Sequence, residues 1–344
     1  MAYTTINKSG DYFGTLLYTG NNTNDRDITG LNFTPDFTWI KPRDYAGNHG
    51  LFDAVRGADK SIRSNQTRVE DTSPSNKDLD SFISGGIRVD QSNYIDTNSD
   101  GISTAAWNWK ANGQGSSNTD GSINTTYTSA NTTAGFSISS YTGTGSSATI
   151  GHGLGVAPEF IITKQLSSTQ DWNVQATLLG YSKYLVLNST AAQANTSGAL
   201  ISSVSSSTIT VDGNAQVNGS GATYVMYCFA SKTGYSKIGT YNGNGSATNA
   251  PFIYTGFKPK FLMIKGYAGS DEWVIFDDER LGYNDANYRL YANLTAAEEG
   301  GGKIDILSNG FRPVSNWGSV NYVTGEYIYM AFGQSLVGSN NTPC

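Results

Sequence analysis

Short apolar runs recur along the chain, and clusters of Gly, Asn and Ser separate them. The runs are rich in β-branched and aromatic residues and are too short for helices, so they predict strands. In the middle of the chain they cover residues 160–164, 183–187, 208–211 and 224–229. Strands of this length at this spacing favour an antiparallel β-sandwich or jelly roll.

A series of four motifs occurs three times along the chain in the same order. Each copy opens with Tyr-(Thr/Asn)-Gly, continues with Pro-x-Phe-x-x-x-Lys and Asn-x-Thr-x-x-(Glu/Gln), and closes on an aromatic-rich run. The motifs begin at Tyr18, Pro35, Asn65 and Ala105 in copy one, at Tyr141, Pro158, Asn188 and Tyr224 in copy two, and at Tyr241, Pro259, Asn293 and Tyr327 in copy three. A repeating unit of about 100 residues has the size of a domain and is far longer than a solenoid repeat.

The repeats predict three tandem domains and not the blades of a propeller. We place β modules at residues 1–112, 135–232 and 233–338, with a tail at residues 339–344. Residues 113–134 are almost all small and polar, which is typical of a flexible linker. Modules two and three are joined only by residues 231–234, so we expect these two modules to pack as a rigid pair.

The Asn-x-Thr-x-x-(Glu/Gln) motif predicts one short helix in each module. Its threonine would cap the helix, and the Glu or Gln three positions later would reach back to form a capping box. The capping threonines are Thr67, Thr190 and Thr295, and good helix formers follow the last two. The predicted fold class is therefore all-β, with three tandem antiparallel β-sandwich modules that resemble jelly rolls and carry one short helix each.

Composition narrows the function. Only 15% of the residues are charged, and the polarity comes from Gly, Ser, Thr and Asn, which is typical of turn-rich β proteins. The net charge of −6 argues against a nucleic-acid partner. The first residues lack the charged and apolar regions of a signal peptide, and no apolar run approaches the roughly 18 residues of a spanning helix. We therefore expect a soluble protein without membrane insertion, synthesised in the cytoplasm.

Copies one and three share the motif Phe-Asp-x-x-Arg, at Asp53 with Arg56 and at Asp277 with Arg280. The carboxylate could serve catalysis or ligand binding, or it could form a structural ion pair between strands. Copy two has Val-Gln-Ala-Thr-Leu in this stretch, with Gln175 matched to the aspartates, so we favour the structural interpretation. The Lys that ends Pro-x-Phe-x-x-x-Lys in each copy is expected to extend over an apolar rim.

Asp96, Asn98 and Asp100, followed by Gly101, resemble the opening of a calcium loop. Trp107 stands where the twelfth-position Glu of such a loop is needed, so this calcium site is a weak candidate and a polar hairpin loop is the better account. The two histidines, His49 and His152, lie at different places in their copies and predict no zinc site or triad. We expect no cofactor and no catalytic residue.

Several motifs together resemble a tandem module of virion proteins from marine tailed bacteriophages. These are the Tyr-Thr-Gly-Asn opening, the strands at residues 155–164 and 256–265, Ser-Asn-Gly-Phe at residues 308–311, and the final Tyr-Ile-Tyr-Met-Ala-Phe. The resemblance spans residues 1–338. Copy one departs from the pattern, with Asn32 in place of the Gly and Gly85-Gly86-Ile87 in place of Asn-Gly-Phe.

The resemblance implies a virion structural protein, either a tail fibre or a decoration of the head or tail, with host-surface adhesion as a further role. It implies other virion proteins as partners and a homo-oligomer, with a trimer favoured. Two alternatives stay open, a lectin-like protein that binds a host glycan or receptor and a tailspike enzyme that degrades polysaccharide. We do not expect an enzyme, because no cluster of titratable residues converges. Host contact would fall to exposed aromatic residues, for which the candidates are Trp172, Tyr267, Tyr283 and Trp317.

Overall fold

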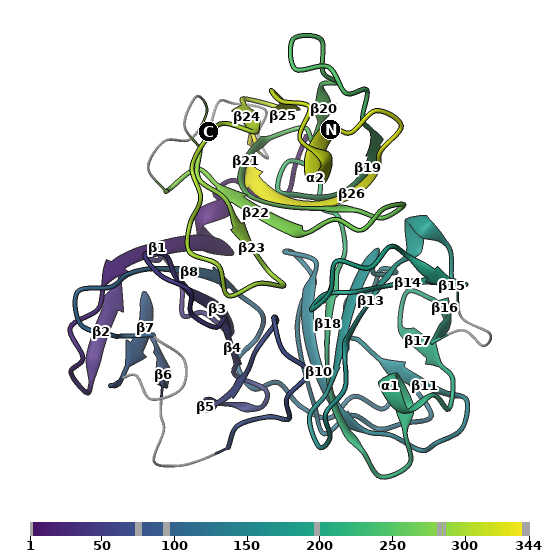
Figure 1. Ribbon diagram of the computed structural model, residues 1–344. Helices are drawn as coiled ribbons and strands as arrows, with labels where there is room; N and C mark the ends of the chain where they lie inside the picture. The colour runs from purple at the N-terminus through teal and green to yellow at the C-terminus, as the bar shows by residue number, and fades with distance from the viewer. Residues whose placement is uncertain are drawn as a thin grey trace.

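The chain folds into three lobes around a common centre, as the computed structural model shows (Figure 1). The structure describes residues 3–72, 78–91, 97–195, 200–280, 284 and 287–338. Nearly all regular structure is antiparallel strand, which confirms the predicted all-β fold class. Within these residues no helix is both long and apolar enough to cross a membrane.

Lobe one contains copy one and forms a five-stranded and a three-stranded sheet. Its strands are β1 (Phe13–Thr19), β2 (Arg26–Thr29), β3 (Phe37–Pro42), β4 (Gly50–Asp53), β5 (Gly57–Ile62), β6 (Leu79–Ile83), β7 (Gly86–Val89) and β8 (Ser103–Trp109). The large sheet has the order β1-β8-β3-β4-β5 and the small one β2-β7-β6. A 3-10 turn, Ser9–Asp11, precedes β1.

Lobes two and three repeat this strand order. Lobe two contains β9 (Tyr127–Asn131), β10 (Phe136–Thr142), β11 (Ala148–Gly151), β12 (Phe160–Gln165), β13 (Trp172–Ala176), a 3-10 turn (Thr177–Leu179), β14 (Lys183–Val186), β15 (Ala194–Asn195), β16 (Ile201–Val204), β17 (Thr208–Val211), α1 (Ala215–Asn218) and β18 (Thr223–Phe229). Lobe three contains β19 (Ser236–Asn242), β20 (Ile253–Tyr254), β21 (Lys258–Gly266), β22 (Trp273–Asp277), β23 (Leu290–Tyr291), β24 (Ile304–Leu307), β25 (Gly310–Pro313), α2 (Gly318–Asn321) and β26 (Glu326–Gln334). Their large sheets run β10-β18-β12-β13-β14 and β19-β26-β21-β22-β23, and the first carries β9 and β15 as extra edge strands.

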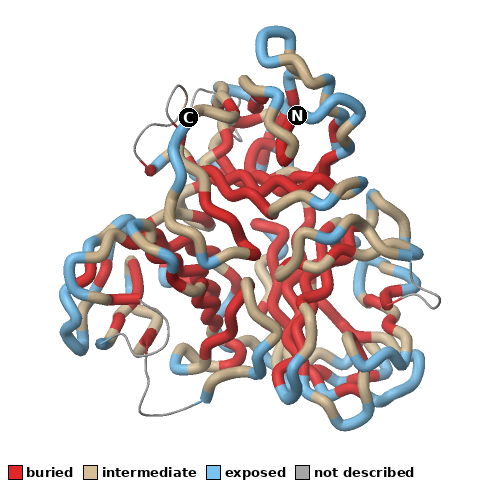
Figure 2. Tube along the Cα trace, viewed as in Figure 1, coloured by how far each residue is buried: buried red, intermediate tan, exposed pale blue. Residues whose placement is uncertain are grey.

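Each large sheet is buried on both faces. Because side chains alternate across a strand, Ile40 and Phe52 of lobe one pack outward against the small sheet, whereas Trp39 and Leu51 point inward. The inward faces of all three large sheets share one hydrophobic core, which is the buried region at the centre of Figure 2. This double burial explains why β3, β12 and β21 have no exposed residue along the part that pairs with the last strand of each lobe.

Three equivalent aromatic residues meet at the centre. Trp109, Phe229 and Phe332 occupy the same register position near the end of the last strand in their lobes. Their ring centroids are 6.5 Å apart for Trp109 and Phe229, 5.7 Å for Trp109 and Phe332, and 5.9 Å for Phe229 and Phe332. The three copies are therefore arranged with approximate threefold symmetry around this contact.

The segment at residues 113–134 is not the flexible linker that its composition predicts. Its β9 pairs with β10, Ser116 bridges Thr128, and Ile123 is buried beside Ile150. Its small residues permit close backbone packing, since a Cβ added to Gly115 would lie 2.1 Å from the Thr128 carbonyl oxygen. The segment forms an edge of lobe two.

The predicted capping-box helices do not form. Thr67, Thr190 and Thr295 lie in irregular segments, and the short helices α1 and α2 lie elsewhere, just before the last strands of lobes two and three. The Asn of the motif instead binds within its own lobe. Its side-chain oxygen accepts a hydrogen bond from a backbone N–H at the start of β4, β13 or β22. The pairs are Asn65 with His49 at 3.1 Å, Asn188 with Trp172 at 2.8 Å and Asn293 with Trp273 at 3.0 Å.

The rest of the motif joins neighbouring lobes. The threonine carbonyl oxygen accepts a hydrogen bond from the repeated lysine of another copy, in the pairs Lys164–Thr67 at 3.1 Å, Lys265–Thr190 at 2.8 Å and Lys41–Thr295 at 3.2 Å. The backbone N–H of the Glu or Gln donates to that same copy, in the pairs Glu70–Leu166, Gln193–Tyr267 and Glu298–Arg43. Lobe one thus contacts lobe two, lobe two contacts lobe three, and lobe three returns to lobe one.

A ring N–H completes each of these junctions. Trp172 Nε1 donates to the Arg63 carbonyl at 2.8 Å and Trp273 Nε1 to the Val186 carbonyl at 2.9 Å. His49 takes the equivalent place in lobe one, and its Nε2 lies 2.8 Å from the Tyr291 carbonyl oxygen. The repeated lysines are fully buried at the junctions, so the prediction that they extend over an apolar rim was wrong.

We predict that Lys265→Met lowers the free energy of unfolding by about 1–3 kcal/mol, because the carbonyl oxygens of Thr190 and Asp271 lose their shared donor inside the protein. Urea denaturation measures the change. Lys8→Met, at an exposed position, is the matched control and should have no effect. Equal midpoints for Lys265→Met and wild type would contradict the junction assignment.

The difference in stability between wild type and Lys265→Met should depend on pH. Burial lowers the pKa of Lys265 from 10.5 to about 8. Between these two values the unfolded chain binds more protons than the folded one, so the lysine becomes less costly to bury as the pH rises. Urea titrations of both proteins from pH 7.5 to 9.5 should show wild type gaining stability relative to the variant, and a constant difference would refute the shift.

Candidate functional site

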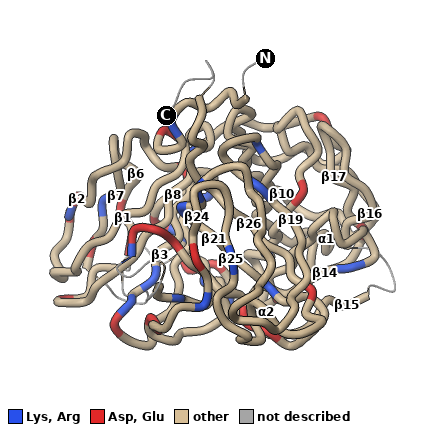
Figure 3. Tube along the Cα trace, turned by 90° about the horizontal axis from the view of Figure 1, so that it is seen from above, with Lys and Arg blue, Asp and Glu red and all other residues tan. Residues whose placement is uncertain are grey.

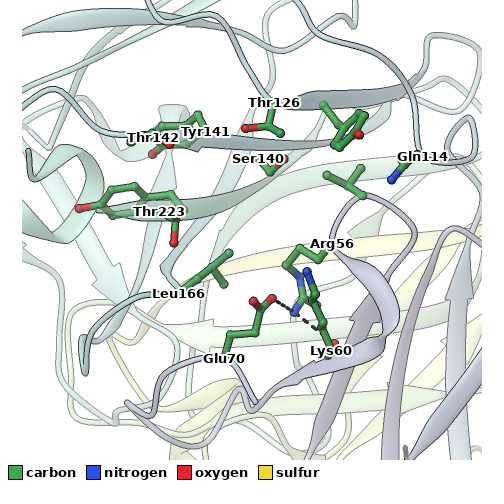
Figure 4. Close-up of a pocket in the computed structure, with 13 residues that line it drawn as sticks. Arg56, Lys60, Glu70, Gln114, Thr126, Ser140, Tyr141, Thr142, Leu166 and Thr223 are labelled. Carbon is green, nitrogen blue, oxygen red and sulfur yellow. Dashed lines mark hydrogen bonds and ion pairs between the residues drawn. The ribbon is translucent and has the colours of Figure 1, made fainter. Parts of the chain in front are cut away.

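A pocket of about 320 Å³ lies at the junction of lobes one and two (Figure 4). One wall, from lobe one, carries the charged side chains of Arg56, Lys60 and Glu70. The opposite wall, from lobe two, is rich in hydroxyl groups and tyrosine rings. It is formed by Gln114, Thr126, Tyr127, Ser140, Tyr141, Thr142, Leu166, Thr223 and Tyr224.

A buried ion pair lies behind the charged wall. Asp53 Oδ2 accepts hydrogen bonds from Arg56 Nε at 2.5 Å and from the hydroxyl of Tyr227, across the junction, at 2.7 Å. Arg56 Nη1 reaches Glu70 Oε1 at 3.0 Å. Asp53 has no exposed surface, and burial keeps the pKa of Tyr227 well above its ordinary value, so this hydroxyl acts as a donor.

The junction of lobes three and one contains the same arrangement. Asp277 Oδ2 accepts from Arg280 Nε at 2.7 Å and from Trp107 Nε1 at 2.9 Å. Arg280 Nη1 lies 3.0 Å from Glu298 Oε2. Glu298 also accepts two hydrogen bonds from Arg43 of lobe one, whose pKa is raised chiefly by this contact.

The junction of lobes two and three has an apolar version. Phe160 pairs with Ala176 as Phe37 pairs with Asp53, so Ala176 and not Gln175 is the residue equivalent to the aspartates. Leu179, three residues after Ala176, takes the place of the arginine, and Gln193 takes the place of the glutamate. The donor across the junction, Tyr227 or Trp107 in the other two cases, becomes Met330. Charge and partners are lost together, as expected where removing one member alone would leave a buried charge unpaired.

These contacts support the structural interpretation of Phe-Asp-x-x-Arg. A glycosidase needs two carboxylates on either side of the scissile bond. Here Glu70 lines the pocket in an ion pair with Arg56, and Asp53 lies behind that arginine with no exposed surface. The pocket offers hydrogen-bonding groups and ring surface to a ligand. The sequence does contain a signal for the third member of this set, because Glu70 and Glu298 accompany the aspartates, whereas Gln193 accompanies Ala176.

The candidate binding aromatics do not form one surface. Trp172 was predicted to be exposed, but it is fully buried because its indole N–H serves the junction of lobes one and two. Tyr267 is half-buried against the central core, and its carbonyl accepts from Gln193. Trp317 is half-buried in lobe three, with the Arg289 guanidinium 4.9 Å from its ring centroid. Tyr283 lies outside the described residues.

The candidate calcium loop has a structural role at its central residue. Asn98 is buried, and its Oδ1 accepts from the backbone N–H of Asn21 at 3.1 Å and from Arg26 Nη1 at 2.9 Å. A guanidinium at this oxygen disfavours a cation. Asp100 is exposed, and Asp96 lies outside the described residues. In the part of the chain that is described, no group of three His, Cys, Asp or Glu residues could hold a metal ion.

Asn98 also has counterparts in the other lobes. Asn218 Oδ1 accepts from the backbone N–H of Thr144 at 2.8 Å, and Asn321 Oδ1 from that of Asn244 at 2.9 Å. Each asparagine therefore holds the loop that follows β1, β10 or β19.

The histidines are neutral parts of the fold. His49 Nδ1 accepts from Trp39 Nε1 at 2.7 Å, which leaves Nε2 protonated to donate to Tyr291. Burial lowers the pKa of His49 well below its ordinary value. His152 Nδ1 accepts from the backbone N–H of Leu154, and burial lowers its pKa as well.

The ion pair can be tested by exchanging it for the apolar junction. Asp53→Ala alone should cost about 3–5 kcal/mol of folding free energy, because Arg56 stays buried and loses its main partner. The fourfold variant Asp53→Ala, Arg56→Leu, Glu70→Gln, Tyr227→Met copies the junction of lobes two and three and should cost less. Urea denaturation compares the two proteins. A fourfold variant at least as unstable as the single variant would contradict a structural role.

The chain was compared with known proteins. No curated protein matches it. One family model matches residues 8–335, which covers all three lobes and nearly the whole chain. The chain therefore belongs to the family described as Domain of unknown function (DUF7483).

Proposed function

We propose that the protein is a structural component of a bacteriophage particle, either a tail fibre or a decoration of the head or tail, and that it also attaches to the host surface. The observation that carries this proposal is the closed ring of three copies. Its repeated lysine and threonine, and the tryptophan or histidine at the start of β4, β13 or β22, hold the copies together.

A ring of this kind suits a particle with symmetric parts. Virion components commonly assemble around symmetry axes, and repeated surfaces allow one protein to meet several equivalent neighbours. The ring presents three similar lobes from a single chain, so it provides the geometry of a trimer without separate subunits. We propose that one chain completes this fold by itself. The homo-oligomer, with a trimer favoured, stays a prediction about how several such chains assemble with other virion proteins.

The charge distribution is compatible with a surface role. Seen from above, charged residues are few and scattered among neutral ones, with both signs interspersed (Figure 3). The motif that suggested catalysis, Phe-Asp-x-x-Arg, forms buried ion pairs that lie within one lobe, at the junction with the next. We therefore propose a structural and adhesive protein ahead of an enzyme that degrades polysaccharide.

Location on the particle tests this proposal. Particles of a phage whose genome encodes the chain are banded on a density gradient and analysed by mass spectrometry. Antibodies to the folded protein then locate it on the particles by electron microscopy. We expect the chain in the particle band and label at a fixed place on the tail or head. A chain that stays in the lysate supernatant while known virion proteins band would refute the proposal.

A further inference from the structure

Lobe three contains a second pocket, which has a volume of about 430 Å³. It lies between the loop that joins β21 to β22 and the segment from α2 to the start of β26. The lining residues are small or polar except for Tyr322, and they include the acidic residues Asp271 and Glu326. Its volume is within the range of small-molecule sites.

Two glycines leave room for the carboxylate of Asp271. A Cβ added to Gly266 would lie 2.2 Å from Asp271 Oδ2, and one added to Gly269 would lie 3.1 Å from the same oxygen. Within the described residues this side chain forms no hydrogen bond or ion pair, although its backbone carbonyl accepts from Lys265. The carboxylate is therefore positioned at the pocket wall and remains available to a ligand.

In the other two lobes the equivalent loop provides a side chain that accepts a hydrogen bond from the last strand. In lobe two the Ser167 hydroxyl accepts a hydrogen bond from the backbone N–H of Thr223 at 3.1 Å. In lobe one Asp44 Oδ2 accepts one from the backbone N–H of Ser103 at 2.6 Å. Lobe three has Ala268 at this place, so the backbone N–H of Glu326, a residue that lines the pocket, lacks this side-chain acceptor.

The remaining pocket groups also differ from those of lobe two. Register and junction contacts align Asp271, Tyr322 and Glu326 with Gln170, Gly219 and Thr223 of lobe two. Both carboxylates and the aromatic ring are thus particular to lobe three in this comparison. Thr324 is also held at a φ of 63°, a costly conformation for a threonine, and residues strained in this way cluster at functional sites.

These groups match the chemistry of a sugar. A carboxylate accepts hydrogen bonds from two neighbouring hydroxyls, and a backbone N–H donates to a ring or hydroxyl oxygen. Tyr322 is 59% exposed, and its ring offers an apolar face to the C–H groups of a pyranose. Two carboxylates, Asp271 and Glu326, repel uronic or sialic acids.

We propose that Asp271, Tyr322 and Glu326 form a binding site for a neutral saccharide of the host surface. This inference deepens the adhesive part of the proposed function by naming the site and the class of ligand. Asp271 and the amide of Glu326 provide hydrogen bonds of opposite direction, and Tyr322 provides the stacking surface.

The test uses the full chain on a glycan array that carries neutral, amino and acidic saccharides, followed by calorimetry with the best neutral binder. We expect neutral sugars to bind. Asp271→Gln and Tyr322→Gly, which introduce the residues of lobe two, should each weaken binding by about tenfold to a hundredfold. Gln170→Ala changes the residue of lobe two that is equivalent to Asp271, and it should leave the affinity unchanged.

Several outcomes would overturn the proposal. They are no binding of neutral sugars, exclusive binding of acidic or amino sugars, binding that requires added calcium, and neutral-sugar binding that both pocket variants retain. Thermal melting checks that the variants fold. Asp271→Gln should not disturb the junction of lobes two and three, because Lys265 binds only the backbone carbonyl of Asp271. Sugar binding by a chain that is absent from particles would refute only the virion role. A chain on particles that binds no neutral sugar would refute only this site.

Discussion

The structure depends on the burial of the inward faces of three large sheets against one another. Within a lobe the small sheet covers only the outer face of the large one, so the inner face, with residues such as Trp39 and Trp107, can leave water only by contact with the other lobes. Burial of apolar surface contributes roughly 25 cal/mol per Å², and large aromatic residues contribute most. Folding of each lobe and assembly of the ring are therefore coupled.

Polar contacts decide how the sheets meet at the edges of this core. A buried lysine is costly unless its ammonium group is hydrogen-bonded, and each junction provides two carbonyl oxygens for it, one from each lobe, as at Thr67 and Gln170 around Lys164. The same geometry recurs at every junction, while the charged groups beside it are exchanged as sets. Two junctions have an Asp, an Arg and a Glu, and the third has Ala176, Leu179 and Gln193. The fold thus tolerates either a complete ion pair or a complete apolar contact.

Because the repeated residues are used inside the ring, differences between copies fall on the loops. Lobe three has the carboxylate of Asp271 and an exposed tyrosine where lobe two has an amide and a glycine, on an otherwise similar framework. This division suits an adhesive structural protein, since a rigid centre allows one lobe to specialise without disturbing the others. Loops on a rigid scaffold commonly carry binding function for the same reason.

The sequence by itself determined the strands and the threefold repetition, because alternating apolar runs and turn residues report local structure directly. It also indicated that Asp53 and Arg56 form an ion pair, since these residues are only three positions apart. Tertiary structure decided the rest. Asn-x-Thr-x-x-(Glu/Gln) resembles a helix cap, yet its Thr carbonyl binds a lysine from another copy. Trp172 looks like a surface aromatic, yet its partner is Arg63 of lobe one. Residues 113–134 read as a linker, yet Ile123 packs beside Ile150. In each case the partner is distant along the chain, and local pattern contains no information about which distant carbonyl or side chain will be adjacent after folding.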